Sequence, residues 1–179
     1  MFGHTSLKTV VAGLAVAAVV MGCEVEDDDL MGPAQQPQQP APVNQPVSVI
    51  SMQGPLEVTL IADRANYQRH ETVYLQIRVR NTGHSAVTFN FTTGQQHDFF
   101  AETHGGAVWR YSNGQHYSRV AHHVTVQPGE TWVREGTWDQ RDNTGWEVPR
   151  GVYGMRGVVT HYSGNASPVF SEMLPITLR

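Results

Sequence analysis

The sequence has few of the residues that usually reveal a chemical class. Its one cysteine, Cys23, cannot form an internal disulfide. Its one lysine is Lys8, no basic block exists, and the net charge is −4 with an isoelectric point near 6.1. These values exclude a strongly basic nucleic-acid binder. No apolar run reaches the roughly 18–20 residues of a membrane-spanning helix, and the length of 179 residues fits one domain of ordinary size.

Motifs of catalysis and metal binding are also missing. The sequence contains no G-x-S-x-G, no P-loop and no G-x-G-x-x-G. His122 and His123 are adjacent and would point to opposite faces of a strand, and the spacing of His97 and His104 fits no zinc motif. Loops could bring five carboxylates near one another, but their spacing does not single out a catalytic pair for glycoside chemistry. These carboxylates belong to Asp98, Glu102, Asp139, Asp142 and Glu147. We expect no enzyme, no metal and no cofactor.

The acidic residues are unevenly distributed. Five of the 16 lie within residues 24–29, which leaves 11 acidic residues and 11 arginines from Val47 onward. The folded part is therefore close to neutral. It has no field that would steer a polyanion or an anionic membrane toward it, so we expect no nucleic-acid partner.

The first residues have the pattern of an export signal. Val10–Met21 is a 12-residue stretch without charge that follows Lys8, which fits the apolar region of a secretory signal. The sequence Val20–Cys23 resembles the bacterial lipobox, in which the cysteine becomes the lipidated first residue of the mature protein. An ordinary signal peptide that happens to contain a cysteine is the alternative.

This resemblance predicts a lipoprotein signal peptide over residues 1–22 and lipidation of Cys23. Several acyl chains on one residue suffice for stable anchoring, and Glu24 in the next position favours the outer membrane. Residues 23–52 are first acidic and then rich in Pro and Gln, so we expect a disordered tether that connects the anchor to a domain spanning 53–179. The expected location is the cell envelope, outside the cytoplasm.

The remaining sequence alternates like β-strands. In Thr72–Arg80 the residues Val73, Leu75, Ile77 and Val79 fall on one face and polar residues on the other. Further predicted strands are Leu56–Leu60, Val87–Phe91, Asp98–Glu102, Ala107–Ser112, Tyr117–Val126, Thr131–Trp138, Gly151–His161 and Val169–Leu178. Short strands at this spacing predict an all-β sandwich or barrel. Turns are expected at Gln127–Glu130 and Pro149–Gly151, and Asn113-Gly114 predicts a tight hairpin.

An ordered series of motifs resembles the BsuPI-like family of intracellular proteinase inhibitors. The series consists of Thr93–Phe99, Val108–Ser112, Pro128–Glu130, Trp138 and Pro149–Tyr153, and the resemblance extends over about Leu56–Leu178. Its motif positions here are Gly94, Gln95, Asp98, Phe99, Trp109, Ser112, Gly129, Glu130, Trp138, Gly151 and Tyr153. The resemblance implies an Ig-like antiparallel β-sandwich and a role in inhibiting a serine proteinase. The export signal departs from the family's intracellular setting.

The motif residues also have a direct physical interpretation. Gln95, Gln96 and Asp98 begin a strand beside Gly94, so they are expected to bond neighbouring loop backbone and fix the crossing between sheets. Trp138 is expected to close one end of the core; a platform for a ligand is the alternative.

Three functions fit these observations. The domain could be a binding module for a protein, peptide or glycan, a proteinase inhibitor, or a structural accessory of an envelope complex that binds through a sheet edge and has no inhibitory activity. The predicted binding loop is Asp139–Glu147, with Asp139, Gln140, Arg141, Asp142, Asn143 and Trp146 as candidate residues. Arg141 would suit a trypsin-like pocket, and an ordinary solvent-exposed connection is the alternative for this loop.

Overall fold

The computed structural model describes residues 45–162 and 168–179, which belong to one compact unit, Pro40–Arg179. The predicted signal peptide, Cys23 and the tether up to residue 44 lie outside the described residues. The described residues form twelve strands and contain no helix. Accordingly, within these ranges there is no helix long and apolar enough to cross a membrane.

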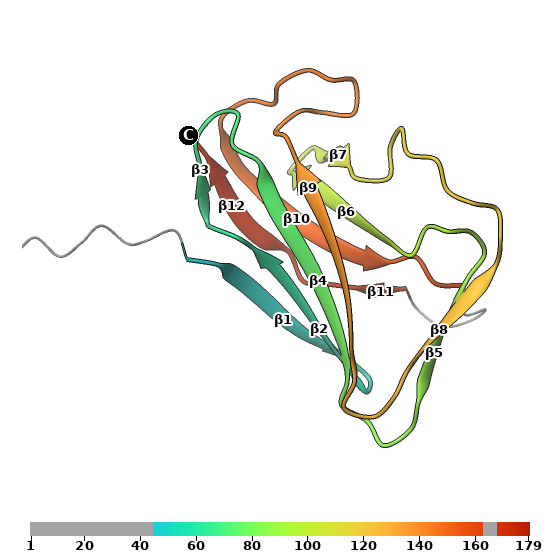
Figure 1. Ribbon diagram of the computed structural model, residues 1–179. Coiled ribbons are helices and arrows are strands. Elements are labelled where there is room, and N and C mark those ends of the chain that lie inside the picture. Colours follow the sequence, from blue (N-terminus) through green and yellow to red (C-terminus); the bar gives the residue numbers. More distant parts are fainter. Residues whose placement is uncertain (1–44, 163–167) are drawn as a thin grey trace, which may run out of the picture. The chain divides into compact units, whose positions relative to one another are not determined.

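The strands are arranged in two sheets and a separate ribbon (Figure 1). The four-stranded sheet has the order β1 (Val47–Gln53), β2 (Leu56–Ala62), β4 (Val73–Asn81), β9 (Thr131–Trp138). The six-stranded sheet has the order β3 (Asn66–Tyr67), β12 (Leu174–Leu178), β10 (Gly151–Val159), β6 (His97–Thr103), β7 (Gly106–Arg110), and β11 (Val169–Phe170) also pairs with β10. The ribbon consists of β5 (Val87–Phe91) and β8 (His122–Val126).

The all-β fold class is confirmed, and the sheets are arranged as a sandwich. Every pairing is antiparallel within the described residues except that of β3 with β12, which is parallel and joins two residues on each strand. The predicted Val169–Leu178 strand is divided into β11 and β12, because Ser171–Met173 leave the ladder between them.

Alternating side chains explain how the two sheets meet. In β4, Val73, Leu75, Ile77 and Val79 are buried, as the sequence pattern predicts. A Cβ atom added to Gly157 of β10 would lie 3.0 Å from Cδ1 of Ile77. The sheets therefore approach closely at this point, and the core between them is dominated by aliphatic and aromatic side chains.

The predicted boundary between tether and domain at residue 53 is wrong. Residues 47–53 form β1, which pairs with β2 over its whole length. Val47 and Val49 are half-buried, whereas Ser48 and Ile50 are exposed. The alternation is weak because this strand lies at the edge of the sheet, and the Pro/Gln-rich residues before it conceal it further.

The predicted hairpin at Asn113-Gly114 is also wrong. A turn does form there, with Gly114 at a φ of 75°, but the chain continues without a strand until His122. β7 instead pairs with β6 through the turn at Thr103–Gly106, where Gly106 has a φ of 110°. Residues 113–116 are exposed and lack the alternating apolar side chains that a second strand would need.

Candidate functional site

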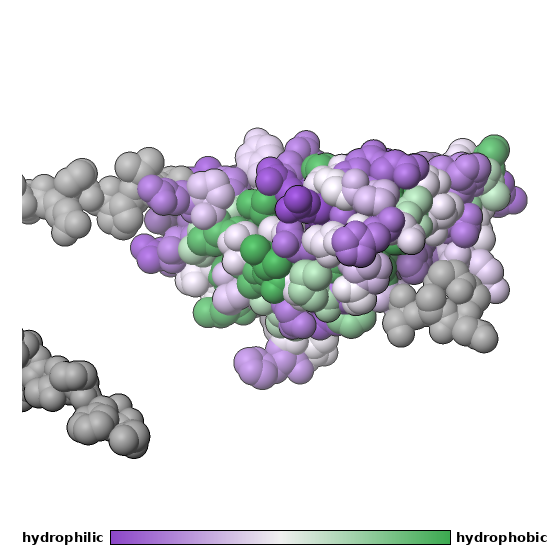
Figure 2. Space-filling view, turned by 90° about the horizontal axis from the view of Figure 1, so that it is seen from below, coloured by the Kyte–Doolittle hydropathy of each residue, from purple (hydrophilic) through white to green (hydrophobic). Residues whose placement is uncertain are grey.

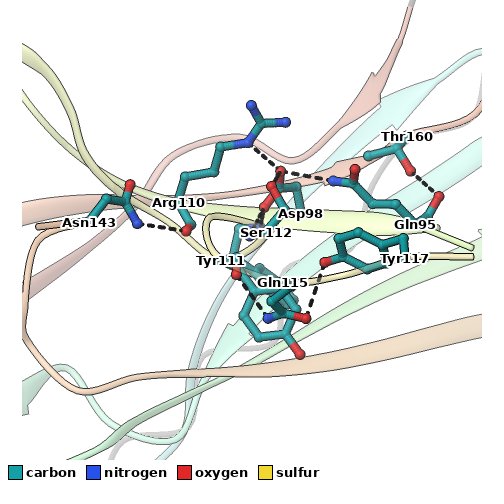
Figure 3. A network of polar contacts seen from close by, with 10 residues as sticks. Gln95, Asp98, Arg110, Tyr111, Ser112, Gln115, Tyr117, Asn143 and Thr160 are labelled. Carbon is teal, nitrogen blue, oxygen red and sulfur yellow. Dashed lines mark hydrogen bonds and ion pairs between the residues drawn. The ribbon is translucent and has the colours of Figure 1, made fainter. Parts of the chain in front are cut away.

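Asp98 is the centre of a polar network at the start of β6 (Figure 3). Its carboxylate is 1% exposed and accepts hydrogen bonds from Arg110 Nε at 2.6 Å, Ser112 Oγ at 2.7 Å and Gln95 Nε2 at 3.1 Å. It also accepts the backbone N–H groups of Ser112 and Phe99, each at 3.0 Å. Charge-assisted bonds of this kind are the stronger ones, so Asp98 fixes the segment before β6 to the turn after β7.

The network extends to the loop that the sequence singled out. Asn143 Nδ2 donates to the carbonyl oxygen of Arg110 at 3.0 Å, and Asn113 Nδ2 donates to that of Asn143 at 3.2 Å. On the other side, Thr160 Oγ1 donates to the carbonyl oxygen of Gln95 at 2.8 Å. Figure 3 shows the contacts of Asn143 with Arg110 and of Thr160 with Gln95 on either side of Asp98. Asp98 thus lies between the end of β10 and the tip of the 139–147 loop.

A second polar cluster joins Gln96, the residue before β6, to β8 and β9. Arg134 Nε donates to Gln96 Oε1 at 2.7 Å, and Gln96 Nε2 lies 2.6 Å from His122 Nε2. The guanidinium of Arg134 is 4.5 Å from the ring centroid of Trp132, and burial lowers the pKa of Arg134. Gln96 therefore bonds side chains rather than the loop backbone that the sequence analysis expected.

The motif aromatics form part of the core. Trp138 is 1% exposed, stacks on Trp109 at a centroid distance of 5.7 Å and contacts Tyr153 edge-on at 5.4 Å. Its Nε1 donates to the carbonyl oxygen of Arg141 at 2.7 Å, and Tyr153 Oη donates to that of Pro149 at 2.6 Å. Trp138 and Trp109 are therefore packing residues and not a ligand platform.

The remaining motif positions shape turns and close contacts. Gly129 has a φ of 80° in the turn before β9, where Glu130 accepts the N–H of Gln127 at 2.7 Å. A Cβ atom on Gly94 would lie 2.7 Å from Ser118 Oγ. Phe99 is fully buried, and Gly151 begins β10. These residues therefore determine turns and close packing contacts of the sandwich.

The loop Asp139–Glu147, which we call the display loop, is closed on itself. Arg141 and Glu147 form an isolated antiparallel bridge. Asp142 Oδ1 accepts hydrogen bonds from Thr144 N at 2.8 Å, Thr144 Oγ1 at 2.7 Å and Trp146 N at 3.0 Å. These bonds lower the pKa of Asp142. The loop has a defined conformation that its own side chains stabilise.

Gln140 does not belong to the exposed surface of the display loop. It is 6% exposed, has a φ of 63°, and its Nε2 donates to the carbonyl oxygens of Gln68 and Glu71, both at 2.7 Å. Its own carbonyl oxygen accepts the N–H of Val148 at 3.0 Å. The expectation of an exposed Gln140 is wrong because this residue fastens the base of the loop to the 68–71 turn.

Trp146 is the side chain that the display loop exposes most clearly. It is 76% exposed, whereas the other three tryptophans are buried. The guanidinium of Arg141 turns back onto the loop, where Nη1 donates to the carbonyl oxygen of Gly145 at 2.8 Å and Nη2 lies 3.7 Å from Glu147. Glu147 also pairs with Arg69 at 2.8 Å. Trp146 was a candidate residue from the sequence, but its exposure was not predicted, because buried Gln140 lies in the same polar segment.

Two of the histidines, His97 and His161, pack against aromatic rings. His97 lies 5.3 Å from the ring centroids of both Phe99 and Tyr111, and His161 lies 5.2 Å from that of Phe89. Burial lowers the pKa of His97 and of His161. In the part of the chain that the structure describes, no group of three or more His, Cys, Asp or Glu side chains is arranged to hold a metal ion.

The described residues form a β-sandwich domain from which the internally braced display loop projects. The chain belongs to the BsuPI family, described as "Intracellular proteinase inhibitor", whose profile matches residues 60–163. The family resemblance seen in the motifs is thereby confirmed. This family is generally non-enzymatic, and an inhibitor domain implies a protein partner such as a proteinase. No curated protein matches the chain.

Several solved structures are similar to part of the chain. The sporulation control protein Spo0M from Bacillus subtilis is 18% identical, with a TM-score of 0.42 over 70% of this chain and 49% of that one. A β-glucosidase from Erythrobacter marinus is 19% identical, with a TM-score of 0.39 over 74% of this chain and 16% of that one. The C-terminal domain of Wzt is 9% identical, with a TM-score of 0.43 over 76% and 80%. The chain thus spans a sixth of the glucosidase and about half of Spo0M.

Proposed function

We propose that this domain is a binding module that inhibits a serine proteinase through the display loop, with Trp146 as the side chain that enters the enzyme's specificity pocket. The observation that carries the proposal is the combination of a braced backbone and an exposed anchor. Asp142 holds three donors of its own loop, whereas Trp146 projects from it with 76% of its surface exposed.

This combination suits an inhibitor for a physical reason. A segment that is already ordered loses little conformational entropy on binding, so more of the contact energy appears as affinity. Tryptophan is among the side chains that most often dominate binding energy at interfaces. Family membership adds the expectation of a proteinase as the partner.

The contacts of Arg141 bear on the kind of pocket that the loop would enter. Arg141, the residue that suits a trypsin-like pocket, has its guanidinium engaged by Gly145 and Glu147. Trp146 needs a large apolar pocket, as in chymotrypsin-like or subtilisin-like enzymes. We therefore expect the loop to prefer enzymes whose specificity pocket is large and apolar.

The test is a titration of the purified full chain against subtilisin-like, chymotrypsin-like and trypsin-like proteinases. We expect stoichiometric inhibition of an enzyme with a large apolar pocket, loss of inhibition in Trp146→Ala, and retention in Arg141→Gln. Val152→Ala is the matched control, because Val152 is an apolar residue on β10 with 65% exposure. Digestion of the chain as a substrate, or inhibition unaffected by Trp146→Ala, would refute the proposal.

We also propose that the domain acts outside the cytoplasm, tethered through lipidated Cys23 and preferentially at the outer membrane. The supporting observations are the apolar Val10–Met21 stretch and the lipobox-like Val20–Cys23. Intact mass of the membrane-extracted protein should show loss of residues 1–22 and added acyl mass. A Cys23→Ser variant that remains on membranes after high-salt washing would contradict the anchor.

If no proteinase is inhibited while an envelope protein is captured by the tethered chain, the accessory role without inhibition replaces the inhibitor role. That result would leave the fold and the family membership unchanged.

A further inference from the structure

The outer edge of β1 is an unprotected sheet edge. Within the described residues, β1 makes backbone hydrogen bonds only with β2, so its other edge has no backbone partner there. The strand is seven residues long, and its sequence VSVISMQ contains no charge and no proline. Proteins usually protect such edges with charges, prolines or bulges, and β1 has none of these.

The opposite edge of the same sheet differs. β9 contains Arg134 and Glu135, and the carbonyl oxygen of Glu135 is 3.1 Å from Nε2 of His97. Side chains therefore cover part of that edge. The contrast between the two edges shows that β1 is the strand of this sheet most able to accept an additional strand.

Hydrophobic surface accompanies the open edge. Ile50 and Met52 point to the solvent side of the sheet, with exposed fractions of 61% and 57%. Figure 2, the view from below, shows hydrophobic residues gathered on the left half of the domain, the side on which β1 lies in Figure 1. A strand added to β1 would lie beside these side chains, and its own side chains on that face would pack against them.

A cavity of about 750 Å³ adjoins the end of β1. Its walls come from the β1–β2 turn, from β5 and from β11, and they include Phe89 and Phe170. The volume lies in the range of sites that hold a ligand or a large side chain. Gln53 connects β1 to this region, because its Nε2 donates to the carbonyl oxygen of Phe170 at 2.5 Å.

Two buried polar atoms of residues that line this cavity lack partners. These are Oγ of Ser51 and Nδ1 of His161, which make no hydrogen bond with any residue of the described ranges 45–162 and 168–179. A buried polar group without a partner costs free energy, so this wall of the cavity is not fully satisfied by the described residues alone. Glu172, an exposed carboxylate, is the acidic residue among the lining residues.

From these observations we infer a second binding site in which an extended peptide segment of a partner protein adds to the edge of β1 and places one apolar, uncharged side chain in the adjoining cavity. The peptide backbone would pair with β1, and the inserted side chain would contact Phe89 and Phe170. This is strand addition, in which main-chain bonds supply affinity and a pocket supplies selectivity. The absence of charge on β1 and the carboxylate of Glu172 favour a neutral segment followed by a basic residue.

The site is separate from the display loop, since none of its residues lies between Asp139 and Glu147. Its failure would leave the proposed inhibitor role intact, and the reverse also holds. A domain with both sites could bind an enzyme and an envelope partner together.

The experiment selects peptides from a library of random decapeptides against the full chain and measures their binding by fluorescence anisotropy. We expect selected peptides with alternating β-branched residues and one large apolar residue. Ile50→Lys, which puts a charge on the edge, and Phe170→Ala, which removes an aromatic wall of the cavity, should each weaken binding at least about tenfold. Val152→Lys is the matched control, because it places the same charge on a similarly exposed site of β10.

Two further measurements make the result decisive. Bound peptide should slow amide hydrogen exchange across residues 47–53, and methylation of the peptide's backbone nitrogens should abolish binding, because strand addition needs those N–H groups. Selection of no peptide, or binding unaffected by Ile50→Lys and Phe170→Ala, would overturn the inference. So would dimerisation of the chain that Ile50→Lys abolishes, because a second copy would then occupy the edge.

Discussion

The region around Asp98 and the display loop use polar side chains in opposite ways. Around Asp98, the carboxylate is 1% exposed and its bonds join segments that are distant in sequence. In the display loop, Asp142 bonds residues two to four positions away and leaves Trp146 in solvent. The first arrangement builds the frame, and the second builds a projection from it.

This difference teaches which changes should affect stability and which should affect binding. A residue that connects distant segments stabilises the whole fold, so its loss lowers the free energy of unfolding. A residue that stabilises or is exposed on a projecting loop should mainly affect the affinity for a partner. Substitutions in the two regions can therefore test this division.

The largest effect is expected for Asp98→Ala. The substitution leaves the buried N–H of Phe99, the half-buried N–H and hydroxyl of Ser112 and the Nε of Arg110 without their acceptor. We expect the free energy of unfolding to fall by about 3 kcal/mol. Urea unfolding measures it, with Asp139→Ala as the control, because the carboxylate of Asp139 is exposed. Equal stability of the two variants would abolish the proposed distinction between frame and projection.

A somewhat smaller loss is expected for Gly136→Ala. The new methyl group would lie 2.7 Å from Cδ2 of Phe99, which is fully buried and cannot withdraw. Overpacking of this kind costs about 2 kcal/mol. Gly105→Ala is the control, because its nearest atom would be 3.7 Å away. Thermal unfolding distinguishes them, and a Gly136→Ala variant as stable as the control would show that the two sheets can separate freely here.

Gln140→Ala sharpens the border between the two regions. It removes two hydrogen bonds that fasten the base of the display loop to the carbonyl oxygens of Gln68 and Glu71. We expect a loss of about 1 kcal/mol in stability and a weaker inhibitor, because the loop base is released. Gln127→Ala, at an exposed position, is the control. Unchanged inhibition by the Gln140→Ala protein would show that the hydrogen bonds at the base of the display loop are not needed for inhibition.

The smallest effect is a dependence of stability on pH. Burial lowers the pKa of His97 and His161 below the ordinary value of 6.5, so below pH 6.5 the unfolded chain binds more protons than the folded one. The free energy of unfolding should therefore fall as the pH drops from 7.5 to 5.5. The double variant His97→Gln, His161→Gln should show a shallower dependence. A folded state that gains stability on acidification would contradict the described burial of these rings.

The sequence predicted the regular parts of this molecule well. β4 and β9 were found because burial on one face imposes alternation, and the motif aromatics were recognised as core because they surround a strand pattern. β1 was missed because an edge strand buries only half of one face. The Asn113-Gly114 hairpin was predicted in error because turn residues indicate a reversal of the chain but not whether the residues after the turn pair as a strand.

The display loop was located from its polarity and length, but its internal geometry was not predictable. Gln140 and Trp146 both lie in the same polar segment, yet one is buried and the other projects. Their difference depends on contacts with Gln68 and Glu71, which are about 70 positions away in sequence. A local pattern has no information on such contacts.

The central claim is that Trp146 is the residue through which the domain binds a proteinase. All four tryptophans of the chain can be labelled with 5-fluorotryptophan and followed by fluorine NMR while an active-site-intact, subtilisin-like proteinase is added at low temperature. The account predicts that the resonance of Trp146, assigned through Trp146→Phe, shifts and broadens, whereas those of buried Trp109, Trp132 and Trp138 stay in place. An unchanged Trp146 resonance under conditions in which the proteinase is inhibited would contradict it.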